Sequence, residues 1–404
     1  MKKKEPLLLP PPGSGRFREL FRPTFRLRSA FLPKNAPPPD FLLLAAVLLL
    51  ALEGTAMIYS AGSAYATFRY DDPTFFIRKQ TLWLAVGLVM MFAVSRVKTE
   101  AVEGIAGVAY LFTLVLLLLV LAVGFVGNGA QRWISLGPVT VQPSEIAKMT
   151  LVLMMARYFS VYEDLALEPK NARRIFWYGT VYPALFLLAV VILVMLQKHL
   201  SCIIILGLIG FLLIVSSGVR LKYILGFTGI GAAGVACLAL FTDYTKERIT
   251  VWQNPEAYRL TGGWQTLQGL MAIGSGGLFG LGAGNSLLKY CYISEPANDM
   301  IFTVLCEETG FFGALATLLL FALLIARGYR TALRADTVFA RLTAFGISTK
   351  IAVQTLLNVA VVTNTIPNTG ISLPFFSYGG SSLVMLFVEM GILLSISRFA
   401  RAQA

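Results

Sequence analysis

Apolar residues along this 404-residue chain gather into ten long stretches that polar intervals separate. Most stretches run for about 17–25 residues, the length that an α-helix needs to cross a bilayer. The pattern therefore predicts an all-α polytopic membrane protein with about ten transmembrane helices. The expected helices cover residues 41–61, 80–95, 101–125, 143–158, 175–196, 200–216, 221–241, 299–326, 340–363 and 378–397.

The longest hydrophilic interval, residues 242–298, predicts a large extracellular loop between the seventh and eighth helices. Gly280, Gly282 and Gly284 resemble a nucleotide-binding loop, but no strand precedes them as such a loop requires. A re-entrant or interfacial helix with a glycine-rich turn fits this segment better. Backbone of that kind must be covered by protein or face water.

The two ends of the chain differ from the helical part in composition. Residues 1–40 are rich in Pro, Lys and Arg, which predicts a disordered basic tail at an anionic leaflet. The membrane domain is expected at 41–398 and a short cytoplasmic C-terminus at 399–404. The tail is not a cleavable signal, because the apolar stretch that follows is too long.

The charge distribution gives the orientation. The chain is 56% hydrophobic with a net charge of +13, and most of its Lys and Arg fall on the side of the two termini. Cytoplasmic loops of membrane proteins carry such an excess, so both termini are expected in the cytoplasm of a multi-pass protein. The same rule explains the positive charge without a nucleic-acid partner. The loops at 126–142, 242–298 and 364–377 then face outside.

A polar cluster is expected where the 126–142 loop meets the fourth helix. Glu145 and Lys148 are three residues apart and share one helix face. They form either an internal ion pair or part of a site that binds phosphate. Arg132 beside Trp133 is either an interfacial anchor or a second substrate-binding cation.

Asp299 opens the eighth helix, with Glu307 and Glu308 one to two turns deeper. Asp299 either complements the positive end of the helix dipole or carries chemistry. Two adjacent carboxylates at membrane depth require partners, and one of Glu307 and Glu308 is expected to order a neighbouring helix by hydrogen bonding.

The turn before the last helix is uncharged and rich in small polar groups, including Ser377 and Ser381. It is either a capped connection between helices nine and ten or one wall of an outward cavity. Four scattered cysteines and the lone His199 do not form the clusters that structural metal sites use. No metal is assigned on this evidence.

Four motifs, in order, closely resemble the SEDS family of bacterial shape, division and sporulation proteins, the FtsW, RodA and SpoVE group. The resemblance spans roughly residues 41–398. Its motifs are Asn128–Ile134, Gln142–Lys148, Asn298–Gly310 and Pro367–Ser382.

The resemblance implies a peptidoglycan glycosyltransferase that polymerises lipid II at the outer face of the bacterial cytoplasmic membrane. It implies Asp299 as the catalytic residue, with Arg132 and Lys148, and Glu145 beside it, at the substrate. Glu307, Glu308, Ser377 and Ser381 are expected to support the site. A class B penicillin-binding protein, a transpeptidase, and other divisome or elongasome membrane proteins are the implied partners. A divalent cation such as Mg²⁺ is compatible with the pyrophosphate of lipid II, but no residue pattern requires one.

The chain departs from the family pattern at His199, where many members have aspartate, and at Met300, where phenylalanine is usual. Two other functions remain open for a protein with these charges: a flippase that moves lipid II across the bilayer, and a non-catalytic scaffold for the penicillin-binding protein. Charges that gather on the outer side favour the enzyme, whereas a flippase requires a polar path through the inner half as well.

Overall fold

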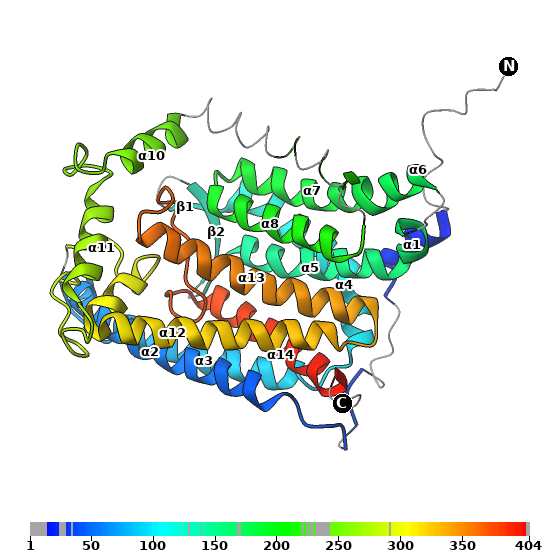
Figure 1. The fold of residues 1–404 in the computed structure, drawn as a ribbon, viewed down its shortest axis with the longest axis horizontal. Coiled ribbons are helices and arrows are strands. Elements are labelled where there is room, and N and C mark those ends of the chain that lie inside the picture. The colour runs from blue at the N-terminus through cyan, green and yellow to red at the C-terminus, as the bar shows by residue number, and fades with distance from the viewer. Residues whose placement is uncertain are drawn as a thin grey trace.

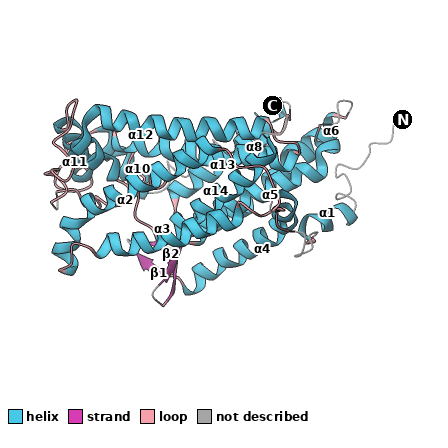
Figure 2. Ribbon diagram, turned by 90° about the horizontal axis from the view of Figure 1, so that it is seen from below, coloured by secondary structure: helices cyan, strands magenta, loops and turns pink. Residues whose placement is uncertain are grey.

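The computed structural model describes residues 14–23, 30–33, 35–127, 130–137, 139–167, 171–219, 222–223, 225, 229, 231, 243–290 and 292–400. Within this part of the chain, long helices lie side by side in an elongated bundle (Figure 1). Helices α1 and α6 and the end of α14 gather at one end of the bundle, and α10 and α11 lie at the other. Figure 2 gives the same arrangement from below.

The helices follow the apolar pattern closely. They are α1 (Ser14–Phe21), α2 (Phe41–Tyr70), α3 (Phe75–Val94), α4 (Thr99–Val123), α5 (Pro143–Ala166), α6 (Ala172–Arg174), the π-helix η2 (Ile175–Val181), α7 (Tyr182–Leu196), α8 (Leu200–Ser216), α10 (Asp243–Gln253), α11 (Trp264–Ser275), α12 (Ile301–Leu333), α13 (Val338–Val362) and α14 (Gly380–Ala400).

Seven helical spans in the described residues are long and apolar enough to cross a membrane. They are α2, α3, α4, the continuous run Ala172–Leu196, α12, α13 and α14. Helix α8 is apolar but shorter, and α5 carries too many charges to meet the same criterion. The expected helix at 221–241 lies almost entirely outside the described residues, so the number ten stays a prediction.

The ends of the helices have local causes. Asp40 accepts a hydrogen bond from the Leu43 N–H at 3.2 Å and so caps α2, as Thr337 caps α13. Pro143 begins α5 at a position where its missing N–H costs nothing. Helix α2 runs beyond the predicted residue 61 to Tyr70 because its last turns pack on Phe76 rather than ending at the apolar boundary.

The prediction of a purely helical chain is wrong between α4 and α5. Strands β1 (Phe125–Gly127), β2 (Ala130–Leu136) and β3 (Val139–Val141) form an antiparallel sheet in the order β1-β2-β3. In its second pair, Ile134 lies opposite Val141. Alternating β-branched and aromatic residues favour strands, and Gly137 supplies the positive φ of +69° that the tight turn needs.

Part of the predicted disordered tail is also helical. Helix α1 packs on α4 and α5 with Leu20 fully buried. The guanidinium of Arg157, on α5, donates to the carbonyl oxygens of Glu19 and Arg22 at the end of α1. A buried cation satisfied by backbone oxygens is a specific attachment, which composition alone does not predict. Residues 1–13 and 24–29 lie outside the described part.

Candidate functional site

Asp299 lies in a short segment whose backbone is held in place from one side. Three consecutive carbonyl oxygens, those of residues 297–299, each accept a hydrogen bond. Their donors are the Tyr378 N–H at 2.9 Å, the Ser377 hydroxyl at 2.8 Å and the Asn358 side-chain amide at 2.8 Å. Helix α13 and the loop between α13 and α14, residues 363–379, thus fix the segment that carries Asp299.

The Asp299 carboxyl group is surrounded by protein atoms although the residue is partly exposed. Burial, and after it the charge of the nearby Glu295, raise its pKa to about 6. Arg248 and the N–H groups of Asp299 and Met300 act in the opposite direction. Gly370, with φ +68°, lies so close that a Cβ atom there would be 3.6 Å from Asp299 Oδ2. This carboxyl group can therefore change protonation near neutral pH.

Helix α10 closes the site from the side of the 242–298 loop. Arg248 donates a hydrogen bond to the carbonyl oxygen of Asn368. The indole N–H of Trp252 donates to the carbonyl oxygen of Asn364 at 2.9 Å. Both acceptors belong to the loop 363–379. The contact between the 242–298 loop and the loop 363–379 therefore holds the cation Arg248 near the carboxyl group of Asp299.

Two buried ion pairs lie deeper in the bundle. Lys148 Nζ is 2.8 Å from a Glu145 carboxylate oxygen within α5, and Lys350 Nζ, on α13, is 2.7 Å from both carboxylate oxygens of Glu389, on α14. All four side chains are buried. Removing one partner of such a pair leaves an uncompensated buried charge, which is strongly destabilising. In this conformation Lys148 forms the internal ion pair that was one of its two predicted roles.

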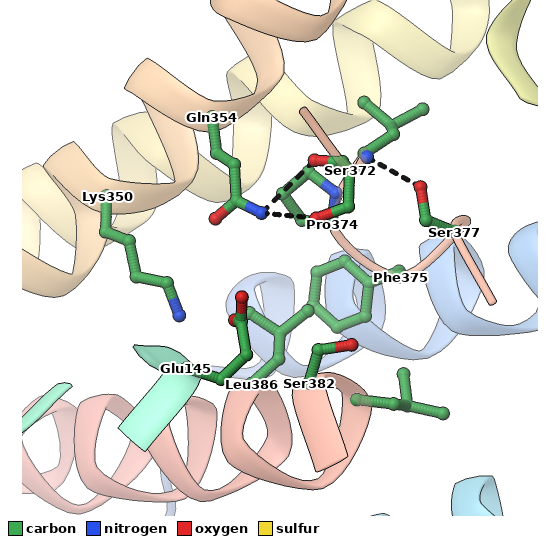
Figure 3. A pocket seen from close by; sticks show the side chains of 11 residues that line it. Glu145, Lys350, Gln354, Ser372, Pro374, Phe375, Ser377, Ser382 and Leu386 are labelled. Carbon is green, nitrogen blue, oxygen red and sulfur yellow. Dashed lines mark hydrogen bonds between the residues drawn. The ribbon is translucent and has the colours of Figure 1, made fainter. Parts of the chain in front are cut away.

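Glu145 and Lys350 point into a small polar cavity between α5, α13 and the loop 363–379 (Figure 3). On the same cavity, the side-chain amide of Gln354 donates to the carbonyl and hydroxyl oxygens of Ser372 at 3.1 and 3.0 Å. The cavity volume of about 20 Å³ has room for a water molecule but not for a sugar. A larger ligand at this position requires the surrounding elements to separate.

Arg132 lies against the turn between α7 and α8. Its guanidinium donates to the carbonyl oxygen of Lys198 at 2.5 Å, and the next residue, His199, has its Nδ1 3.4 Å from the Ser144 hydroxyl. Burial, then the charges of Arg132 and Lys148, lower the pKa of His199 to about 3. The imidazole is therefore neutral at physiological pH, although it lies near the two predicted substrate-binding cations, Arg132 and Lys148.

A series of contacts links this group to Asp299. Ser201, two residues beyond His199, donates its hydroxyl hydrogen to the carbonyl oxygen of Thr369. Thr369 precedes Gly370, which borders the Asp299 carboxyl group. The start of α8 and the loop 363–379 therefore connect Asp299 to the group around Arg132. That the two groups share one cavity stays a prediction.

The two serines predicted to support the site hold two different segments. The Ser377 hydroxyl accepts from the Leu373 N–H at 2.7 Å and donates to Asn298. The Ser381 hydroxyl accepts from the Gln142 N–H at 3.3 Å, at the start of α5. Ser377 thus contacts the residue before Asp299, and Ser381 contacts the helix that carries Glu145.

Glu307 and Glu308 bind a different part of the structure, the glycine-rich loop 276–292. Glu307 accepts from the Ser286 hydroxyl at 2.5 Å and from the Leu287 N–H at 3.0 Å. Glu308 forms a buried ion pair of 2.9 Å with Lys289. Both carboxylates therefore have partners, and no contact of the described residues brings either to Asp299.

Sequence reasoning did not assign several residues of this region to the site. Lys350, Gln354 and Asn358 are four residues apart and form a polar stripe on one face of α13, which helical periodicity could have revealed. Glu389, alone on an apolar helix, also signals a buried partner. Arg248 has no local signal, because its role depends on a contact between two distant loops.

No group of three or more His, Cys, Asp or Glu side chains that could hold a metal ion occurs in the described residues. Asp299 and Glu295 are two nearby carboxyl groups. Mg²⁺ commonly uses one or two carboxylates together with the phosphates of a substrate. The divalent cation thus stays a prediction that depends on bound substrate.

The comparison with known proteins matches residues 40–402 to the family model of the FtsW, RodA and SpoVE group, described as cell cycle proteins. The chain belongs to the FtsW/RodA/SpoVE family. It is 37% identical to stage V sporulation protein E of Bacillus subtilis strain 168, over 90% of this chain and 98% of that protein. It is 34% identical to the "probable peptidoglycan glycosyltransferase FtsW" of Geobacter sulfurreducens, over 89% of this chain and 95% of that one.

Solved structures of the family share the fold. A chain of a peptidoglycan synthase complex, solved in work on the coordination of polymerisation and crosslinking, has a TM-score of 0.74 at 28% identity. The rod shape determining protein RodA of Thermus thermophilus has a TM-score of 0.65 at 29% identity. Each comparison covers 90% of this chain and 98% of the other. This FtsW/RodA/SpoVE protein is therefore a multi-pass membrane protein of the RodA-like fold.

Proposed function

We propose that this protein is a peptidoglycan glycosyltransferase that joins lipid II units into glycan strands by inverting glycosyl transfer. The observation that carries the proposal is the Asp299 carboxyl group, with a pKa of about 6, on a backbone segment fixed by three hydrogen bonds. A relative that covers nearly the whole chain carries the name of this activity. Such a carboxylate is suited to act as a general base at neutral pH.

The reaction balances with one base and one leaving group. The hydroxyl oxygen of the acceptor sugar attacks the anomeric carbon of the donor, and its proton passes to the Asp299 carboxylate. The bond from that carbon to the pyrophosphate oxygen breaks at the same time. The polyprenyl pyrophosphate leaves with the electron pair, and an α-linked donor becomes a β-1,4 link.

Cations stabilise the negative charge that develops on the leaving pyrophosphate. Arg132 is partly exposed beside His199, and a guanidinium can bind phosphate oxygens through two hydrogen bonds. We assign Arg132 to the pyrophosphate. Glu145 and Lys148 act as a pair at the base of the substrate cavity, and the pair faces substrate once the cavity of Figure 3 opens.

The remaining predicted residues act indirectly. Ser377 positions the Asp299 segment, and Ser381 positions the start of α5. Glu307 and Glu308 keep the loop 276–292 against α12, the helix that begins just after Asp299. In this proposal none of the four touches substrate.

The site faces the outside of the bacterial cytoplasmic membrane, and both termini are cytoplasmic. The positive-inside rule supports this orientation, because the basic segments at α1, α6 and the end of α14 share one end of the bundle. Asp299, α10 and α11 belong to the opposite end. In this orientation the protein binds lipid II from the outer leaflet.

A class B penicillin-binding protein is the expected partner, since polymerised strands must be crosslinked. A solved structure of similar fold belongs to a peptidoglycan synthase complex in which polymerisation and crosslinking are coordinated. Other membrane proteins of the divisome or elongasome are also expected partners. Whether division, elongation or sporulation is served depends on which transpeptidase this chain binds.

The enzyme fits the charges better than a flippase or a silent scaffold does. Three ion pairs hold deep charges of the described bundle, Lys148 with Glu145, Lys289 with Glu308 and Lys350 with Glu389, and charges paired in this way do not favour an open polar path. A non-catalytic scaffold does not require a carboxyl group such as that of Asp299, which is costly to ionise and is fixed in place.

The decisive experiment measures glycan chain length from labelled lipid II with the purified protein and its transpeptidase partner. Asp299→Asn keeps the shape of the side chain and removes the base. We expect polymerisation to fall by about 10²-fold or more, the typical contribution of a general base. Glu256→Gln is the matched control, because Glu256 is an exposed carboxylate of the same loop. Polymerisation by Asp299→Asn at the rate of the control would refute the proposal.

A further inference from the structure

A second, apolar cavity lies at the opposite end of the bundle from Asp299, between α1, α4, α5 and α7. Its volume of about 650 Å³ is within the range of small-molecule sites, about 300–1,000 Å³. Its lining is almost entirely aromatic and aliphatic. The proposed glycosyl transfer does not use this cavity, and no residue assigned to the glycosyltransferase site lines the cavity.

Two tyrosines of the cavity wall offer a ligand only their rings. Tyr110 donates its hydroxyl hydrogen to the Phe186 carbonyl oxygen at 2.7 Å, and Tyr158 donates to the Tyr178 carbonyl oxygen at 2.7 Å. Both phenol groups are thus occupied within the protein. The rings of Tyr110 and Phe186 pack edge to face, 5.8 Å apart, which holds this wall rigid. An apolar chain is the kind of ligand that such a surface accommodates.

The cavity opens toward the hydrocarbon of the bilayer. Leu111, on α4, and Leu185, on α7, line it and are 44% and 52% exposed. Both residues belong to helical spans long and apolar enough to cross a membrane. In a membrane, side chains exposed on such spans are covered by acyl chains, so the cavity is continuous with the lipid phase.

A positively charged side chain, that of Arg18, lies at the rim of the cavity. Arg18, on α1, lines the cavity and is exposed, and its guanidinium forms no ion pair within the described part of the chain. Its neighbour Arg16 is already paired with Asp164 at 2.9 Å. Helix α1 is held over the cavity by Arg157, which also donates to carbonyl oxygens of α4 at 2.6 and 2.9 Å. A headgroup with a phosphate would meet Arg18 while its acyl chain occupies the cavity.

We propose that this cleft, formed by α1, α4, α5 and α7, binds an anionic glycerophospholipid from the leaflet on the α1 side. One acyl chain lies against the rings of Tyr110, Tyr158 and Phe186, and the lipid phosphate pairs with Arg18. The bound lipid joins α1 to the two spans α4 and α7.

The test uses the full-length protein in nanodiscs of phosphatidylglycerol or of phosphatidylcholine, released and analysed by native mass spectrometry. We expect one retained phosphatidylglycerol per protein and at least fivefold less retention of phosphatidylcholine. Ala189→Phe, which fills the cleft from α7, should abolish retention. Arg18→Gln should reduce retention of phosphatidylglycerol to the level of phosphatidylcholine.

Two matched controls separate the cleft from the general lipid surface. Ala322→Phe adds the same ring at an exposed position of α12, and Arg334→Gln removes an exposed cation at the same end of the bundle. Both should retain lipid as the unchanged protein does. Leu185→Trp at the mouth of the cleft is a second blocking variant, should Ala189→Phe fold poorly.

Three outcomes would overturn the proposal. The unchanged protein could release no lipid, as it would if a segment of its own chain filled the cleft. The blocking variants could retain lipid like the controls, which would place the lipid elsewhere. Equal retention of both lipids would refute the selectivity for an anionic lipid. None of these results bears on Asp299, so failure here leaves the glycosyltransferase proposal untouched.

Discussion

At the scale of single residues, Asp299 combines two properties that a general base needs. Its backbone is fixed by hydrogen bonds from Tyr378, Ser377 and Asn358, and burial raises the pKa of its carboxyl group to about 6 from an ordinary 3.8. A base close to the working pH accepts a proton without being permanently protonated. The buried environment that makes the Asp299 carboxyl group costly to ionise therefore also makes it suitable as a general base.

The raised pKa predicts the pH dependence of polymerisation. Because the ionised carboxylate is the active form, the rate should rise with pH and reach half of its plateau near pH 6. Below that value the rate should fall about tenfold per pH unit. Initial rates with labelled lipid II between pH 5 and 8 measure this profile. A rate that is flat between pH 5 and 7 would show that Asp299 does not act as the base.

Asp299 also predicts an effect on stability with a definite sign. The folded-state pKa lies above the unfolded value, so the folded protein binds the proton more tightly and loses stability as pH rises from about 4 to 6. Asp299→Asn carries no charge and escapes this loss, which amounts to at most about 3 kcal/mol. At pH 7.5 its apparent melting temperature should equal or exceed that of the unchanged protein, whereas at pH 4 the difference should vanish. A lower melting temperature at pH 7.5 would mean that the carboxylate stabilises the fold.

At the scale of elements, the apolar pattern predicted the long apolar helices of the described residues, but it did not predict the sheet or the helix α1. Helix α8 spans Leu200–Ser216, the range that the pattern predicts, because lipid-facing helices must be continuously apolar. The sheet at 125–141 was missed because three short strands lie inside what looks like a polar loop. Helix α1 was missed because its attachment depends on Arg157, far away in sequence.

The same distinction applies to the site. The sequence indicated Asp299, Arg132 and the turn before α14, since charges and small polar residues stand out among apolar helices. It could not indicate Arg248, whose hydrogen bond joins two loops more than a hundred residues apart. Nor could it decide that Lys148 is paired with Glu145 in this conformation, because helical spacing permits both the pair and an exposed cation.

Helix α12 is interrupted where the glycine-rich loop meets it. Gly310 has φ +68°, and loop 277–282 takes up the freed backbone groups. The Leu281 and Gly282 N–H groups donate to carbonyl oxygens of α12 at 2.9 and 3.0 Å, and the Phe311 N–H donates back to Gly277 at 2.9 Å. The loop thus replaces helical hydrogen bonds, which backbone at membrane depth cannot leave unmade.

This arrangement predicts that Gly310→Ala is strongly destabilising. A Cβ atom at Gly310 would lie 2.3 Å from the backbone nitrogen of Gly280, and the positive φ is itself unfavourable for alanine. We expect the apparent melting temperature in detergent to fall by about 5 °C or more. Gly274→Ala, in helix α11, is the control, because a Cβ atom there meets nothing within 4 Å. Equal melting temperatures for the two variants would contradict a close fit between loop and helix.

At the scale of the whole molecule, the function needs the two ends of the bundle to face different compartments. The end with α10 and α11 carries the loops around Asp299, and the end with α1 and α6 carries the basic segments. Lipid II can be polymerised into the cell wall only if the first end faces outside. The buried ion pair between Lys350 and Glu389, which joins α13 to α14, lies between these two ends.

Two exposed leucines allow this orientation to be measured. Leu260, in the 242–298 loop, is 85% exposed, and Leu333, at the end of α12, is 84% exposed. Each is changed to cysteine in a background whose four native cysteines are alanine. A membrane-impermeant maleimide should label Leu260→Cys in intact spheroplasts and label Leu333→Cys only after permeabilisation, since a charged reagent does not cross the bilayer. The reverse pattern would place Asp299 on the cytoplasmic side, where no growing glycan strand is available, and would exclude polymerisation at the outer face.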